Sequence, residues 1–146
     1  MRPFSRNTLQ AVTALTAATL LSAAPAMADE MWDSALGPIL WDSDLGDVAI
    51  WRLDDLTNGT VVRLYLPGLA ADVSGGRGAY RGFWLAEGGD PAEACLTQMI
   101  APDGMKSLFW GQVTLTFVRP DFPSDWAGVV GQCFDTPSMP LAGAAR

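Results

Sequence analysis

The chain has no histidine among its 146 residues. This absence excludes His-containing catalytic triads, acid–base catalysis by imidazole, and zinc or copper sites built on imidazole. Only one lysine has a serine as its neighbour, Lys106 before Ser107, and adjacent residues of a strand point to opposite faces, which argues against a Ser–Lys mechanism. We therefore expect no metal, no cofactor and no catalytic residue of these kinds.

Cysteine is almost as scarce, since Cys95 and Cys133 are the only two. Two cysteines in an exported chain indicate one disulfide bond, which would close a loop of about 38 residues. In the chain-entropy model, a disulfide that closes such a loop stabilises the folded state by roughly 4 kcal/mol. A redox-active pair is not expected because the C-x-x-C spacing is missing.

After the N-terminus, no segment is long and apolar enough to span a bilayer. At the N-terminus, Arg2 and Arg6 precede an apolar run from about Leu9 to Ala24, and Ala26-Met27-Ala28 is typical of a cleavage site. This plan predicts a secretory signal peptide at residues 1–28, cleaved after Ala28, and a periplasmic or secreted protein.

Basic residues are few in the predicted mature chain. Removing Arg2 and Arg6 from the nine basic residues leaves seven, against 16 acidic ones, so the net charge becomes −9. A domain this acidic repels phosphate backbones and anionic membrane surfaces, so nucleic-acid binding is not expected. The charge is compatible with a cationic protein partner.

The clearest structural pattern is the segment from Ser107 to Val118. Its odd positions from Phe109 to Phe117 are apolar or glycine, and its even positions from Trp110 to Thr116 are mainly polar. Strict alternation over this length predicts a half-buried strand whose side chains point to two faces.

Other strands are predicted on both sides of this one. Val48–Leu53 and Thr60–Leu66 form a hairpin across the Asn58-Gly59 turn, Tyr80–Ala86 follows, and Gly128–Phe134 comes last. A short helix has room only between Ala92 and Ile100, with Asp90 as its cap. The pattern predicts an all-β protein, a small antiparallel β-barrel or sandwich of about five to eight strands with one disulfide.

We expect one β domain at residues 29–136 and a disordered tail at residues 137–146, because the tail is rich in proline and small residues. Residues 32–37 and 41–46 repeat a Trp-Asp-Ser pattern nine residues apart. Two interpretations stay open: an extended arm that lays its tryptophans over the sheet, or a paired aromatic recognition element.

Two candidate binding surfaces follow from the aromatic residues. The polar face of the central strand places a tryptophan beside amide and hydroxyl groups, which suits a glycan or polar-headed ligand. Its candidate ligand-binding residues are Trp110, Gln112, Thr114 and Thr116, joined by Tyr65 and Arg63 from the neighbouring hairpin. The second surface is the proline-stiffened loop with Phe122 and Trp126, which we predict to contact a protein partner.

These features predict a non-catalytic exported binding module that recognises or inhibits an envelope protein. One alternative is a small-ligand or glycan binder that uses Trp110, and another is a hydrolase based on a pair of carboxylates. In size, compartment, disulfide and strand content the chain is similar to small periplasmic β-barrel modules that inhibit secreted hydrolases or bind small ligands.

Overall fold

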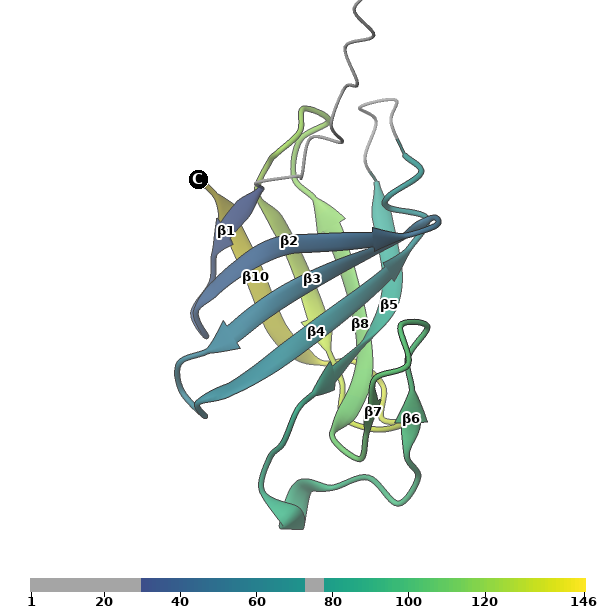
Figure 1. Ribbon diagram of the computed structural model, residues 1–146. Helices are drawn as coiled ribbons and strands as arrows, with labels where there is room; N and C mark the ends of the chain where they lie inside the picture. Colours follow the sequence, from purple (N-terminus) through teal and green to yellow (C-terminus); the bar gives the residue numbers. More distant parts are fainter. Residues whose placement is uncertain (1–29, 73–77) are drawn as a thin grey trace, which may run out of the picture.

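A computed structural model of the protein describes residues 30–72 and 78–146 (Figure 1). The signal peptide predicted at residues 1–28 lies outside these residues. Among the residues described, no helix has the length and apolar character needed to cross a membrane.

Eight antiparallel strands close a barrel, each pairing with the next along the chain and the last pairing with the first. They are β1 (Met31–Asp33), β2 (Pro38–Leu45), β3 (Val48–Asp55), β4 (Thr60–Pro67), β5 (Ala79–Ala86), β8 (Trp110–Phe117), β9 (Trp126–Val130) and β10 (Met139–Ala145). The predicted all-β antiparallel fold is confirmed, and of the two architectures left open the barrel is the one formed. Closure removes the free sheet edges that a sandwich would have to protect.

The long connection from β5 to β8, residues 87–109, is called the flap here. It contains a single 3-10 turn, η1 (Pro91–Glu93), and a hairpin of β6 (Met99–Ile100) and β7 (Lys106–Ser107). Asp90 caps η1 as predicted, accepting a bond of 2.9 Å from the Ala92 N–H. The helix does not continue to Ile100, because Ala94 is already extended. Figure 1 shows the flap reaching beyond one end of the barrel.

The predicted alternation of β8 is confirmed. Val113, Leu115 and Phe117 are buried inside the barrel, while Gln112 and Thr116 are exposed on its outer wall. Every second residue of a strand must face the same side, so closure of the sheet turns one face into a core.

Aromatic side chains fill one end of the barrel. This aromatic cluster consists of Trp32, Trp41, Trp51, Phe117, Phe122 and Trp126. Trp51 lies at its centre, with ring centroids 4.5 Å from Trp32 and 5.6 Å from Trp126. Phe122 enters from the β8–β9 loop and packs edge-on against Trp41 and Phe117, each at 5.7 Å. Such contacts are within the range in which aromatic pairs attract beyond simple burial.

The repeated Trp-Asp-Ser segments lie in this end of the barrel. Trp32 belongs to β1 and Trp41 to β2, and both point into the core instead of lying over the sheet. The Trp32 indole donates a bond of 2.9 Å to the carbonyl of Ser124, which fixes the β8–β9 loop over the cluster. The repeat thus builds the core, so neither earlier interpretation describes it.

The prediction of a disordered tail at residues 137–146 is wrong, and the β domain does not end at residue 136. Met139–Ala145 form β10, which pairs with β9 along its length and with β1 at Ala144 and Ala145. Its small residues are required by packing, because a Cβ atom at Gly143 would come within 2.5 Å of Trp126 Nε1. Small residues that suggest disorder in isolation here make room for a tryptophan.

Candidate functional site

The end of the barrel opposite the aromatic cluster is hollow. A cavity of ≈ 780 Å³, called the cup here, is lined by the ends of β3, β5 and β9, the starts of β4 and β10, and residues of the flap. Pockets for small molecules typically measure about 300–1,000 Å³. The cup is therefore large enough for a ligand of ordinary size.

Apolar side chains form the wall of the cup. They are Leu36, Leu53, Val62, Leu64, Trp84, Phe109, Val130, Met139 and Leu141. Most of these residues are aliphatic, whereas the core at the other end of the barrel is mainly aromatic. The hollow therefore follows from an uneven distribution of large and small side chains along one barrel interior.

Trp84 of β5 is the largest residue of this wall and is only partly buried. Its Nε1 donates a bond of 2.9 Å to the Gly131 carbonyl. Gly111 permits this approach, since a Cβ atom there would lie 1.8 Å from that carbonyl oxygen and 2.7 Å from Trp84 Nε1. The hydrogen bond holds the indole in place and leaves part of its surface to the cup.

The rim of the cup is polar and acidic. Asp55, Asp90 and Glu93 line it together with Asn58, Thr60 and Gln132. Asp55 uses both carboxylate oxygens within the β3–β4 turn, with bonds from Thr57 N–H and from the backbone and side-chain amides of Asn58. Asp90 caps η1, and Glu93 is exposed.

A lateral slit adjoins the cup. It measures ≈ 660 Å³ and lies between β10 and the loop that joins β1 to β2. It exists because β1 is short and pairs with β10 at two positions, which leaves the first part of β10 without that neighbour. The cup and the slit share an apolar wall, formed by Leu36, Val130, Met139 and Leu141.

A second apolar core lies outside the barrel, beneath the flap. Ile50, Tyr65, Leu85 and Trp110 from the outer wall pack with Cys95 and Ala101 from the flap. Trp110 is 3 % exposed, and its Nε1 donates a bond of 2.7 Å to the Thr97 carbonyl of the flap. The flap therefore covers Trp110, the first residue of the strand face that the sequence singled out, and leaves Gln112 and Thr116 exposed.

Polar bonds pin the tip of the flap to β4. Asp103 forms an ion pair of 2.9 Å with Arg63 and accepts the Tyr65 hydroxyl hydrogen at 3.0 Å. Burial opposes ionisation of Asp103, but bonds donated by Met105 N–H, Tyr65 and Arg63 outweigh it and lower its pKa. Burial, followed by the bond to Asp103, raises the pKa of Tyr65, so its hydroxyl stays protonated.

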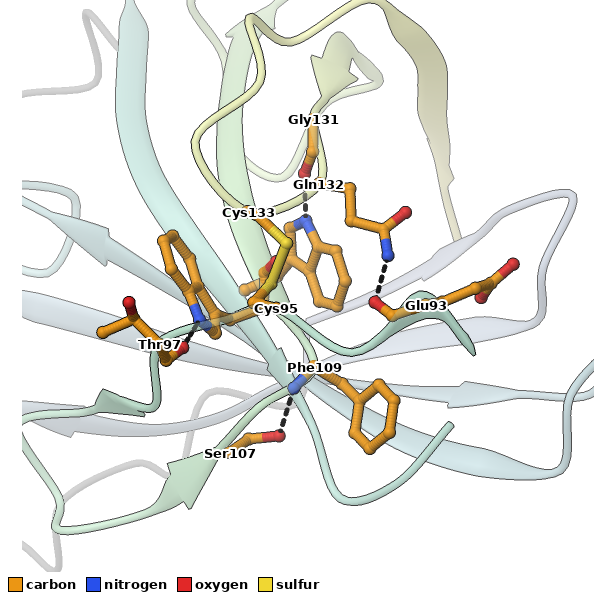
Figure 2. The surroundings of a disulfide bond; sticks show 10 residues. Glu93, Cys95, Thr97, Ser107, Phe109, Gly131, Gln132 and Cys133 are labelled. Atoms are coloured by element: carbon orange, nitrogen blue, oxygen red, sulfur yellow. Dashed lines mark hydrogen bonds between the residues drawn. A yellow bond between two sulfur atoms is a disulfide. The ribbon is translucent and has the colours of Figure 1, made fainter. Parts of the chain in front are cut away.

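The disulfide ties the base of the flap to the rim. The predicted bond between Cys95 and Cys133 is formed and joins the flap to the β9–β10 connection. Figure 2 shows Gln132 beside it, donating its amide hydrogen to the Glu93 carbonyl. The segment that carries Asp90 and Glu93 is therefore attached to the β9–β10 connection by two neighbouring contacts.

The structure brings some of the predicted ligand-binding residues together, but they do not form a surface that a ligand could reach. Trp110 and Tyr65 share the core under the flap, and Arg63 is paired with Asp103. The expectation that Trp110 is accessible for stacking is wrong, because the flap buries it. Gln112, Thr114 and Thr116 do lie along the outer wall of β8, and none of them lines the cup or the slit.

The predicted partner-binding loop is also not as expected. Trp126 is the first residue of β9 and is 1 % exposed, and Phe122 packs within the aromatic cluster. Both side chains turn inward because the barrel end would otherwise be open to water. Their expected exposure on a docking loop is wrong.

Sequence reasoning missed the cup. Its residues lie on the inner face of alternating strands, which the sequence marks as core. A signal was present in the distribution of interior aromatics, since the far end holds the six rings of the aromatic cluster with Tyr80 packed on Phe117, whereas Trp84 and Phe109 are the rings that line the cup. That signal becomes readable only when the strand order and direction are known.

A scan against protein-family models, a search of curated proteins and a search of solved structures each found no match for this chain.

Proposed function

We propose that this protein is a non-catalytic exported binding protein that holds a small apolar or amphipathic molecule in the cup. The observation that carries the proposal is the cavity of ≈ 780 Å³ at one end of a closed barrel. Apolar walls with a few polar groups at the mouth are typical of small-molecule sites. Export is supported by the disulfide, because such bonds persist in oxidising compartments.

This proposal corresponds to the small-ligand alternative and moves its site from the outer wall of β8 to the barrel interior. The first prediction, recognition of an envelope protein, loses the surface on which it rested, since Phe122 and Trp126 lie in the core. The hydrolase alternative requires a pair of carboxylates. At the rim, Asp55 uses both oxygens in a turn and Asp90 accepts the capping bond of η1, so two of the three rim carboxylates already have structural roles.

The first test fills the cup. Val130 lines both the cup and the slit, so Val130→Phe places a larger side chain in the proposed binding space. We expect the mature oxidised protein to bind the neutral fluorescent probe N-phenyl-1-naphthylamine saturably, and the variant to bind it at least about 10-fold more weakly, equivalent to about 1.4 kcal/mol. A fluorescence titration measures both affinities.

Val118→Phe is the matched control, because Val118 follows β8 at the far end of the barrel and is 66 % exposed. It makes the same substitution away from the cup and should leave probe affinity unchanged. Thermal unfolding must show both variants folded. Equal probe binding by Val130→Phe and the wild type would remove the cup as the site.

A further inference from the structure

We infer that the cup selects amphiphiles whose polar end carries a positive charge and discriminates against those with a carboxylate or sulfate. This inference rests on the proposed function and adds the chemical class of the ligand. It follows from the charges at the mouth and from where the basic residues of the protein lie.

The charges that line the cup have one sign. The cup is lined by three acidic residues, Asp55, Asp90 and Glu93. Within residues 30–72 and 78–146, no lysine or arginine is among the residues that line it. Four arginines of the same part of the chain are already paired with aspartates elsewhere. An anionic head at this mouth would meet like charges without a cation to neutralise it.

Geometry strengthens the effect of these charges. The acids stand around a concave opening whose wall is apolar, and low-dielectric walls concentrate the field of charges that line a cleft. Asp90 caps η1 and Glu93 ends it, and the disulfide at Cys95 and the bond from Gln132 attach this turn to the β9–β10 connection at the mouth. In Figure 2 the Glu93 side chain extends away from Gln132 and from the disulfide.

Aromatic rings favour the same class of ligand. Phe109, the last residue of the flap, is partly buried and lines the cup close to Gly89, where an added Cβ atom would lie 2.7 Å from its ring. A cation over the face of an aromatic ring is attracted by the ring quadrupole. A protonated amine or quaternary ammonium at the mouth thus meets carboxylates and an aromatic ring, while its chain occupies the apolar wall.

The experiment compares three probes with the same ten-carbon chain: decyltrimethylammonium, decanol and decyl sulfate, each below its micellar concentration. Each displaces N-phenyl-1-naphthylamine from the mature oxidised protein at low salt. We expect the cation to bind about 10-fold more tightly than decanol and the sulfate at least about 10-fold more weakly, with the difference shrinking at high salt.

Two double variants locate the origin of the preference. Asp90→Asn with Glu93→Gln removes two charges from the rim and keeps a capping side chain at position 90. Asp42→Asn with Asp47→Asn removes two exposed charges from β2 and the β2–β3 turn, toward the far end. The rim variant should reduce the cation-to-sulfate affinity ratio about 10-fold, with decanol affinity measured in parallel as the neutral reference, and the far-end variant should preserve the ratio.

The outcomes separate this inference from the proposed function. If the protein binds N-phenyl-1-naphthylamine but its cation-to-sulfate affinity ratio is near one, the charge preference is overturned and the proposed function stays intact. Equal loss of the ratio in both double variants also overturns it, because net charge and not the rim would then be responsible. Failure of the neutral probe to bind removes the proposed function and the inference with it.

Discussion

At the scale of single residues, two tryptophans with similar chemistry have different roles. Trp84 points into the barrel and lines the cup, whereas Trp110 points outward and is sealed beneath the flap. Each donates one indole hydrogen bond to a carbonyl, Trp84 to Gly131 and Trp110 to Thr97. The difference is which face of the barrel wall each one occupies.

This difference predicts contrasting effects of the same substitution. Trp84→Phe and Trp110→Phe each remove one partly buried hydrogen bond and should each lower the free energy of unfolding by about 1–2 kcal/mol. Only Trp84→Phe removes wall from the cup, so only it should weaken N-phenyl-1-naphthylamine binding, by several-fold. Urea unfolding and probe titration on the two variants measure both quantities, and weaker binding in Trp110→Phe alone would place the site on the outer wall instead.

At the scale of elements, the flap is held by the disulfide at its base and by Asp103 at its tip. The pKa of Asp103 is lowered in the folded protein, so its carboxylate form stabilises the fold. That stabilisation is fully present above the unfolded pKa of about 3.9 and is lost as the pH falls through the lower folded value.

Asp103→Asn tests this linkage. The substitution should lower the free energy of unfolding by about 1 kcal/mol near neutral pH, because the partners are partly exposed and the ion pair is screened. The gap between variant and wild type should close as the pH falls well below about 4, where the wild-type carboxylate is also protonated. Urea unfolding across this range measures the gap, and a gap independent of pH would show that Asp103 acts through something other than its charge.

At the scale of the whole molecule, closure of the barrel depends on its last strand. β10 joins β9 to β1 and covers Trp126, so removing residues 139–146 opens the barrel and exposes the aromatic cluster. We expect this truncation to abolish cooperative unfolding and to produce aggregation through the new strand edges. Circular dichroism during heating, together with gel filtration, measures the change.

Deletion of Arg146 alone is the control for this truncation. Arg146 pairs with Asp33 on the surface, and exposed ion pairs contribute little to stability, so its loss should barely move the melting temperature. A truncation at residue 138 that melts like the full chain would mean that the tail is dispensable after all.

The sequence by itself determined the class of fold and the chemistry that is missing. Alternation in Ser107–Val118, the Asn58-Gly59 turn and the two cysteines act locally or through composition, so they predicted strands, a hairpin and a disulfide that the structure contains. The alternation also separated the two faces of β8 correctly. It did not indicate which parts of the protein would pack against each face.

Only the tertiary structure decided where the hollow lies and what is accessible. The cup exists because interior aromatics gather at one barrel end, and Trp110 is buried because a flap from elsewhere in the chain folds over it. The last strand forms because β9 and β1 offer it partners, despite a local composition of small residues and proline. These outcomes depend on contacts between residues far apart in the sequence, which local patterns do not encode.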